Sequence, residues 1–271
     1  MIAPNSIING DCLEVMKDIA DHSVDCIICD LPYGVTSLAW DVVIPFDLLW
    51  EQYKRIIKPN GAICLFGSQP FTSALVMSNP KWFKYEWIWD KFVGANFGCA
   101  RFQPIKTHEN ILIFSKSSHY YCPQKEGLRI IKNHGNRPRK AGLNFTKDCN
   151  RTLATDGLKY PKSVHRYNSQ LLETNNTNRL HPTQKPIALI EYLIKTYTLE
   201  GELILDNTAG SGTLAIAAIN TNRNYICIEK DDHYFVLMRD RIANHDPFAP
   251  VKTKKPKREV KGQLNLFSQA M

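Results

Sequence analysis

Two short motifs, each at the end of a predicted strand, hold the residues best suited to chemistry. The first is the apolar strand Val24–Asp30, which delivers the Asp30 carboxylate and, after Leu-Pro, the aromatic ring of Tyr33. The second is the strand Glu202–Asp206, which is followed by the small-residue turn Asn-Thr-Ala-Gly-Ser-Gly. Open α/β sheets bind ligands at the carboxyl ends of their strands. Both motifs are therefore placed where a site would form.

The glycines of the second motif, Gly210 and Gly212, would let the backbone approach a ligand that side chains would obstruct. Their spacing lacks the third glycine of the dinucleotide fingerprint and the Gly-Lys-Ser/Thr of a phosphate-binding loop, which disfavours both kinds of nucleotide-phosphate site. The next strand, Asn224–Glu229, ends in a carboxylate that can accept hydrogen bonds from both hydroxyls of a ribose. An ordinary exposed acid at a strand end is the alternative for Glu229.

The elements that must position these motifs alternate along the chain. Short apolar runs and stretches of helical period follow one another, which predicts an α/β sheet of seven strands with helices on both faces. The predicted strands are 6–9, 24–30, 62–67, 85–90, 110–115, 202–206 and 224–229. The predicted helices are 12–19, 45–57, 69–77, 186–197, 213–221 and 231–244.

Positive charge is concentrated in residues 117–180. The chain has a formal net charge of +8, and this segment carries twelve basic residues against four acids. It also mixes aromatic residues with turn formers and shows no clear period, which favours an insert outside the sheet that contacts nucleic acid over a merely solvated surface. The candidate phosphate contacts are Arg129, Lys132, Arg137, Arg139, Lys140 and Arg166.

The order of the motifs divides the chain into four parts. Residues 1–116 form a predicted catalytic half, residues 117–180 the basic insert, and residues 181–245 a predicted cofactor-binding half. Residues 246–271 form a basic tail that we expect to be flexible.

The two motifs together resemble those of the β-group DNA amino-methyltransferases, which include phage-type orphan and restriction-modification methylases. The cofactor motif Asp206-x-x-x-Gly-Ser-Gly-Thr213 and the preceding His181-Pro-Thr-Gln-Lys-Pro186 are similar to those of the group. Catalytic motif, insert and cofactor motif also follow one another in its circularly permuted order. The resemblance implies a class I, Rossmann-like fold with a mixed sheet and S-adenosylmethionine as cofactor.

The resemblance also assigns the cofactor-binding residues. Nearby carboxylates would stabilise the sulfonium and ammonium of this cofactor. Asp11 resembles the acid that faces the adenine ring, although it can equally cap the helix beginning at Cys12. Thr208 stands where the group often has Phe, and His108 is expected to be structural. The cofactor residues are then Asp11, Asp30, Thr183, Lys185, Asp206, Thr208, Gly210, Ser211, Gly212, Thr213 and Glu229.

The tetrapeptide Asp30-Leu-Pro-Tyr33 resembles the catalytic Asp-Pro-Pro-Tyr of the group, with Leu31 as a departure. The resemblance implies that Leu31 contributes only its backbone carbonyl. The Asp30 carboxylate and this carbonyl would accept the two hydrogens of an exocyclic amine and draw its lone pair out of conjugation with the ring. Pro32 would fix the turn, and Tyr33 would stack on a base flipped out of double-stranded DNA.

The target base is predicted to be adenine, methylated at N6, because cytosine-N4 members of the group usually have Ser in place of Asp30. A cytosine-N4 enzyme is the nearest alternative. An RNA or protein methyltransferase is a more distant one, against which the permuted order and the basic insert speak. A catalytically silent DNA-binding subunit is the alternative from another class. No Pro-Cys dipeptide occurs, which argues against cytosine C5 chemistry.

The cysteines predict neither disulfides nor a metal site. Cys26 and Cys29 lie three residues apart on one predicted strand, so their thiols should point to opposite faces of the sheet. No second Cys pair exists to complete a zinc site. Without an apolar stretch of membrane-spanning length or a secretory signal, a cytoplasmic location is expected.

The end of the tail resembles another short motif. Gln263, Leu264, Leu266 and Phe267 form Gln-Leu-Asn-Leu-Phe, which resembles the peptide by which bacterial replication and repair proteins dock on the sliding clamp. A hydrophobic end that packs on the body is the alternative. A homodimer is an open alternative for the assembly.

Overall fold

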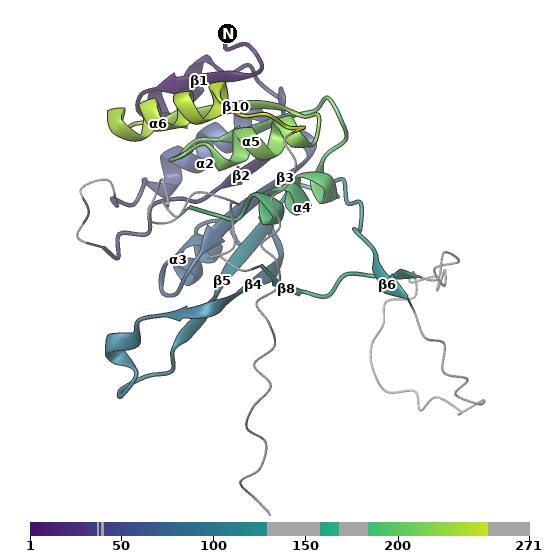
Figure 1. Cartoon of the computed structure of the whole chain (residues 1–271). Coiled ribbons are helices and arrows are strands. Elements are labelled where there is room, and N and C mark those ends of the chain that lie inside the picture. The colour runs from purple at the N-terminus through teal and green to yellow at the C-terminus, as the bar shows by residue number, and fades with distance from the viewer. Residues whose placement is uncertain (37, 39–40, 129–157, 168–183, 249–271) are drawn as a thin grey trace, which may run out of the picture.

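The computed structural model describes residues 1–36, 38, 41–128, 158–167 and 184–248. Strands and helices alternate in it as they do in an α/β protein (Figure 1). The strands are β1 (Ser6–Asn9), β2 (Val24–Cys29), β3 (Ile57–Gly67), β4 (Phe83–Ala95), β5 (Lys106–Phe114), β6 (Glu126–Leu128), β7 (Leu158–Lys159), β8 (Val164–Arg166), β9 (Leu203–Asp206) and β10 (Asn224–Glu229). The helices are α1 (Cys12–Val15), η1 (Met16–Asp18), α2 (Phe46–Ile56), α3 (Phe71–Ser78), η2 (Phe97–Cys99), α4 (Ile187–Tyr197), α5 (Thr213–Asn220) and α6 (Asp232–Ala243).

The main sheet has the strand order β1-β10-β9-β2-β3-β5-β4-β8. The first five of these strands are parallel, and β5 is antiparallel to both β3 and β4. All seven predicted strands form, so the predicted mixed sheet is confirmed. Because β2 and β9 are neighbours, the turns that follow them meet at one edge of the sheet.

The prediction that residues 117–180 lie outside the sheet is wrong in one respect. Residues 164–166 form β8, an eighth strand that pairs in parallel with β4 at the edge of the sheet. The pairing is local, since only three residue pairs make it, and β8 was too short to show a period of its own in the sequence. Residues 126–128 and 158–159 form a separate two-stranded sheet.

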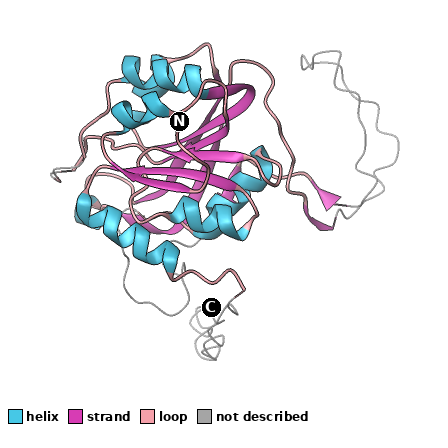
Figure 2. Cartoon of the chain, turned by 90° about the horizontal axis from the view of Figure 1, so that it is seen from above, coloured by secondary structure: helices cyan, strands magenta, loops and turns pink. Residues whose placement is uncertain are grey.

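Helices cover the sheet on both faces (Figure 2). The core on one face contains buried residues of α1, α2 and α3, and the core on the other face contains buried residues of α4, α5 and α6. The central strand β2 is buried along its whole length, as expected for a parallel strand covered on both sides. Its two cysteines enter opposite cores, Cys26 beneath α4 and Cys29 on the other face, which confirms that the thiols diverge.

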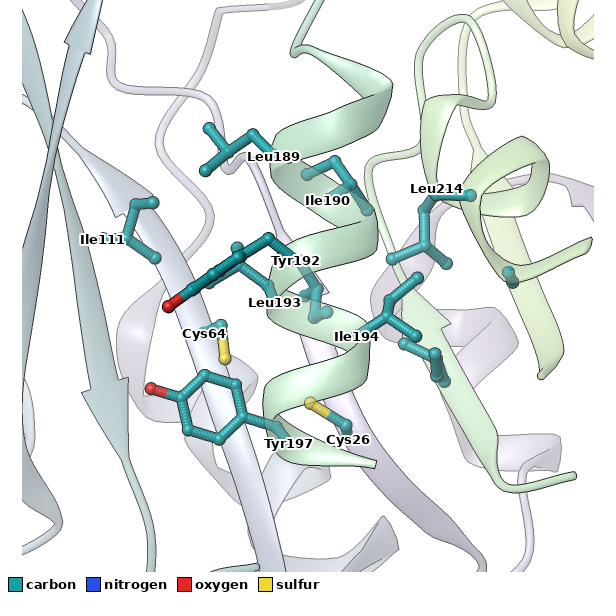
Figure 3. Packing of buried hydrophobic residues seen from close by; sticks show 14 of the residues in the cluster. Cys26, Cys64, Ile111, Leu189, Ile190, Tyr192, Leu193, Ile194, Tyr197 and Leu214 are labelled. Atoms are coloured by element: carbon teal, nitrogen blue, oxygen red, sulfur yellow. The ribbon is translucent and has the colours of Figure 1, made fainter. Parts of the chain in front are cut away.

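Helix α4 shows how apolar spacing fixes an element in place. Leu189, Leu193 and Tyr197 recur at helical period and point toward the strands, whereas Ile190 and Ile194 point toward α5 (Figure 3). The helix follows Pro186, which suits a helix start because its missing N–H would have had no partner there. Every helix in the described part of the chain falls short of the length and apolar character that a membrane crossing requires.

Candidate active site

A cavity of about 890 Å³ opens at the edge of the sheet where β2 and β9 end. Its size is that of a pocket for a cofactor or a drug-sized ligand. The helices that follow the two strands, α2 and α5, cover opposite faces of the sheet, so the edge is a topological switch point. Both predicted motifs line this one cavity, as do Asp11 and Glu229.

The predicted catalytic turn, Asp30–Tyr33, leaves β2 with Asp30 at the wall of the cavity; it is called the catalytic turn below. Tyr33 donates a hydrogen bond from its hydroxyl to Asp30 Oδ1 at 2.7 Å, and its ring stacks on Phe71 with 4.9 Å between ring centroids. Burial and the nearby carboxylates raise the pKa of Tyr33, so the phenol stays protonated and remains a donor. Leu31 and Pro32, which complete the tetrapeptide, also line the cavity.

A buried carboxylate outside the tetrapeptide, that of Asp41, holds the chain that follows it. The backbone N–H groups of residues 33, 34, 35 and 36 and the hydroxyl of Thr36 all donate to it, at 2.7 to 2.9 Å. Gly34 has a φ of 67°, which lets the backbone curl around the carboxylate. These donors outweigh the effect of burial and lower the pKa of Asp41. The Asp41 carboxylate thus fixes the backbone conformation of the chain that follows the catalytic tetrapeptide.

A chain of charges, of which Lys185 is buried and the others are partly buried, runs from Asp30 to the neighbouring strands. Lys185 Nζ lies 2.5 Å from Asp30 Oδ2 and 3.2 Å from Glu109 Oε2. Lys91 Nζ completes the chain at 2.9 Å from Glu109 Oε1. The Lys185 side chain is only 8% exposed and its ammonium lies 5.0 Å from the centroid of the Phe66 ring. Asp30 therefore has a fixed orientation set by a network that spans several elements.

The pKa values within this network follow from burial and from charge. Burial raises the pKa of Asp30, although Lys185 acts in the opposite direction. Burial alone would also raise the pKa of Glu109, but the ammonium groups of Lys185 and Lys91 outweigh it and lower this pKa. Lys185 itself has a raised pKa, since its two carboxylate partners overcome the cost of burying its charge. Lys185 is thus a cation, and removing it would leave Asp30 without a cationic partner while Glu109 kept Lys91.

The predicted cofactor turn, residues 207–212 between β9 and α5, depends on backbone conformation; it is called the cofactor turn below. Gly210 and Gly212 have φ values of 52° and 75°, in the left-handed region that side chains rarely adopt. A Cβ on Gly212 would also lie 2.6 Å from Met238 Cγ of α6. From α6, Arg241 donates to the backbone carbonyl of Ser211 at 2.9 Å and to both the Ser211 and Thr213 hydroxyls at 3.2 Å. These contacts hold the turn against the start of α5.

The carboxylates of this half of the cavity suit a cationic ligand. Glu229 accepts hydrogen bonds from the N–H groups of Gly210, at 2.7 Å, and Asp231, at 2.8 Å. Burial and the proximity of Asp30 and Glu229 raise the pKa of Asp206 to about 7, against the backbone N–H of Thr208 that donates to it. A positive charge bound here would relieve this repulsion, as the sulfonium and ammonium of S-adenosylmethionine would. The residues present therefore fit that cofactor.

Two predicted cofactor residues also have structural partners. Asp11 Oδ1 accepts from Leu13 N at 3.0 Å and caps α1, while its Oδ2 lies 3.0 Å from Lys230 Nζ. Thr208 donates from its hydroxyl to the backbone carbonyl of Asp30 at 3.0 Å. Thr208 thus joins the cofactor turn to the catalytic turn by a hydrogen bond that Phe could not make.

Several predicted site residues lie outside the described part of the chain. They are Thr183, the phosphate-contact candidates Arg129, Lys132, Arg137, Arg139 and Lys140, and the tail residues Gln263, Leu264, Leu266 and Phe267. The remaining phosphate-contact candidate, Arg166, lies on β8 with its side chain 65% exposed and its Nε 2.9 Å from Asp90 Oδ2. Within the described ranges, no group of three His, Cys, Asp or Glu side chains is arranged to hold a metal ion.

Three residues of the site were missed in the sequence: Asp41, Lys91 and Glu109. Asp41 lies eleven residues beyond Asp30, and only the folded loop brings it back. Lys91 and Glu109 lie on the paired strands β4 and β5, each one residue outside the bounds predicted for its strand. An acid directly before the apolar run of a predicted strand is the signal that could have drawn attention to Glu109.

The comparisons with known proteins agree with this geometry. The family described as DNA methylase, with the profile name N6_N4_Mtase, matches residues 24–240. The type II methyltransferase M.HpaI of Haemophilus parainfluenzae is 26% identical over 253 residues, which cover 87% of this chain and 73% of that protein.

Solved structures show the same fold. The M1.HpyAVI–SAM complex has a TM-score of 0.58 at 24% identity, over 88% of this chain and 98% of the other. The cytosine-N4-specific PvuII DNA methyltransferase has a TM-score of 0.63 at 14% identity, over 91% of this chain and 90% of the other. The fold is that of class I S-adenosylmethionine-dependent methyltransferases, and S-adenosylmethionine is the cofactor. Because the family profile matches most of its length, the chain belongs to the N6/N4 DNA methylase family.

Proposed function

We propose that this enzyme is a site-specific DNA methyltransferase that methylates the N6 amino group of adenine in double-stranded DNA. One observation carries the choice of adenine. The acid of the catalytic turn, Asp30, is held by Tyr33 and Lys185 at the wall of the cavity, whereas cytosine-N4 enzymes of the group usually have Ser at this position. We assign the catalytic role to Asp30, Leu31, Pro32 and Tyr33.

The proposed roles follow from the donors and acceptors at the turn. The Asp30 carboxylate and the Leu31 backbone carbonyl accept the two amine hydrogens of the target base, which draws the nitrogen lone pair out of conjugation. When bound, S-adenosylmethionine supplies an electrophilic methyl group on a sulfonium. The chain holds the amine in line for attack, so that positioning supplies much of the rate. Tyr33 and Lys185 keep the carboxylate oriented while it accepts these hydrogen bonds.

The target base must leave the duplex, because its amine cannot be reached inside the stack. In the proposal Tyr33 stacks on the extruded base, and residues 117–180 supply the basic surface that binds phosphates. Neutralising Arg137, Arg139 and Lys140 should then flatten the salt dependence of duplex binding. An unchanged slope would remove these three residues from the interface.

A cytosine-N4 methyltransferase is the second candidate function. It is supported by the similarity in fold to the cytosine-N4-specific PvuII enzyme. Expression in a methylation-free host, followed by modification-sensitive genome sequencing, separates the two. N6-methyladenine within one motif supports the proposal, and N4-methylcytosine would overturn the choice of base. Cofactor binding without any DNA methylation would identify a silent DNA-binding subunit.

A single substitution tests the role of the catalytic turn. Asp30→Ala should reduce methyl transfer by about a thousandfold or more, in the range of removing a preorganised transition-state contact. The affinity for S-adenosylmethionine should stay within a few-fold of wild type, because the cofactor turn is intact. Methyl transfer at the wild-type rate would show that Asp30 has been given the wrong role.

The C-terminal peptide Gln263–Phe267 is proposed to bind the sliding clamp. The test is a pull-down of the full chain with purified clamp. If deleting the residues after Gly262 left the amount of bound protein unchanged, the proposed clamp binding by this peptide would be excluded. A homodimer is tested separately by light scattering of the full chain.

A further inference from the structure

The hairpin formed by β4 and β5 ends in a tip that exposes aromatic side chains. Phe97 is 61% exposed and Phe102 is 88% exposed, and Phe92, at the base of the tip, is 54% exposed. Figure 1 shows the hairpin reaching away from the rest of the sheet, with a short helical turn at its end. A single exposed apolar residue is normal on a protein surface, whereas several on one protruding element indicate an interaction surface.

The tip is a well-defined structure. The N–H groups of Phe102 and Gln103 both donate to the backbone carbonyl of Cys99, at 2.8 and 3.1 Å. Asn96, in the left-handed region with a φ of 61°, accepts from Lys106 N at 2.8 Å and closes the neck of the tip. A Cβ on Gly94 would lie 1.9 Å from the Ile105 side chain, so the two strands approach closely there. The backbone that carries Phe102 is therefore preorganised, and presenting the ring costs little further ordering.

The tip lies at the same edge of the sheet as the active site. Strand β2 is parallel to β3, β3 is antiparallel to β5, and β5 is antiparallel to β4. Strand β4 therefore runs in the same direction as β2, and the carboxyl ends of the two strands lie at the same edge of the sheet. Lys91 and Lys106, at the base of the hairpin, line the cavity that contains Asp30. A molecule entering that cavity from this side would meet the tip.

Charge indicates what kind of molecule this would be. Between Asp90 and Glu109 the chain carries Lys91, Arg101 and Lys106 and no acid; Lys91 pairs with Glu109, so Arg101 and Lys106 supply the positive charge of the hairpin. Beside the tip, the Arg166 guanidinium lies 5.0 Å from the centroid of the Phe92 ring. Aromatic rings among basic side chains are what a nucleic acid surface requires, because the rings stack on bases while the cations neutralise phosphates.

We propose that the hairpin tip, residues 92–105, contacts the target duplex and inserts the Phe102 ring into the base stack beside the extruded base. Extruding a base breaks its stacking on both neighbours and leaves a gap, and a planar apolar side chain at the rim of the active site restores part of that stacking. The inference rests on the proposed methylation of an extruded base in duplex DNA.

The test measures duplex affinity and methyl transfer with the full-length protein. The probe is a labelled duplex that carries the motif methylated by the wild type in the host genome. Phe102→Ala should weaken binding to this duplex about tenfold, in keeping with the loss of one stacking partner. The loss should be smaller on a duplex that is mismatched at the target base, because extrusion there costs less. Phe102→Trp should retain wild-type affinity.

The matched control is Phe248→Ala, which removes a ring that is 91% exposed and lies outside the hairpin. This control should bind and methylate the duplex as the wild type does. Equal losses on paired and mismatched duplexes, or no loss, would overturn the insertion. A changed oligomeric state in Phe102→Ala would instead make the tip an interface between copies of the chain. A wild-type protein that methylates no DNA would overturn the proposed function itself.

Discussion

The two turns that meet at the sheet edge are held in different ways. The cofactor turn depends on two positive-φ glycines and on contacts from β10 and α6, which follow it in the chain within about 30 residues. The catalytic turn depends on charged side chains distant in sequence, with Lys185 lying 155 residues beyond Asp30. A turn whose backbone must approach a ligand needs small residues, whereas a turn that presents a carboxylate needs partners to orient it.

This difference predicts where each turn is vulnerable. The catalytic turn should fail when a distant charge is removed, even if its own sequence is unchanged. The cofactor turn should keep its shape under such changes and respond to the protonation of its carboxylates. Three experiments, in order of decreasing effect, would sharpen or break this contrast.

The largest effect is expected from Lys185→Met. Removing one partner from a buried ion pair costs up to about 3–5 kcal/mol, and here Asp30 loses its cationic partner while Glu109 keeps Lys91. Asp30, whose pKa burial already raises, should then hold a proton to higher pH. We expect lower stability in urea unfolding and an acid limb of kcat that is displaced to higher pH.

The matched control is Lys17→Met. Lys17 pairs with Glu14 at 2.7 Å, but both side chains are more than half exposed, and such surface pairs contribute little. The control should therefore keep the wild-type urea midpoint and pH profile. If Lys185→Met matched the control in both measurements, the buried charge network would have no part in holding the catalytic turn.

Asp41→Asn should have an intermediate effect. The amide offers one acceptor and places an NH2 group against backbone N–H donors, at a cost of about 1–3 kcal/mol for the groups left unsatisfied. We expect the rate constant of methyl transfer, measured in single-turnover experiments, to fall about tenfold or more, with the Kd for S-adenosylmethionine unchanged. Asp47→Asn, at an exposed position on α2, is the control. An unchanged rate constant would show that Asp41 does not hold the catalytic turn in its active conformation.

The same contrast explains how much of the site could be predicted from the sequence. Gly210, Gly212 and Asp206 were recognisable because a small-residue turn between a strand and a helix is a local pattern. Glu109 and Asp41 were not, because their function depends on partners that only the folded chain brings together. Local patterns identify which backbone approaches a ligand, and long-range contacts determine which carboxylate is oriented.

The fold divides in the same way. Strands β1 and β10 were predicted with their observed bounds, since each is a short apolar run between turn residues. Strand β4 extends from Phe83 to Ala95, well beyond the predicted 85–90, because its outer part pairs within the hairpin rather than being buried in the core. Strand β8 was missed altogether, since three residues at a sheet edge carry no period and are specified by their pairing with β4.

The smallest effect is the pH dependence of cofactor binding, which probes the other turn. Asp206 has a pKa of about 7 in the free protein because it is buried near other carboxylates. A cationic ligand favours the ionised form and lowers this pKa, so binding releases a proton. The Kd for S-adenosylmethionine should therefore rise as the pH falls below about 7, by at most about tenfold per pH unit, and should level off above it.

Calorimetry between pH 5.5 and pH 7.5 in buffers of different ionisation enthalpy would measure both the affinity and the released proton. Asp206→Asn removes the titrating group, so its Kd should be higher than that of the wild type at pH 7.5 but should change little with pH. Lys17→Met should keep the pH dependence of the wild type, because Lys17 pairs with the exposed Glu14 and not with a carboxylate of the cavity. If the wild-type affinity were independent of pH across this range, the cofactor cations would not lie near Asp206, and the acidic half of the cavity would need another explanation.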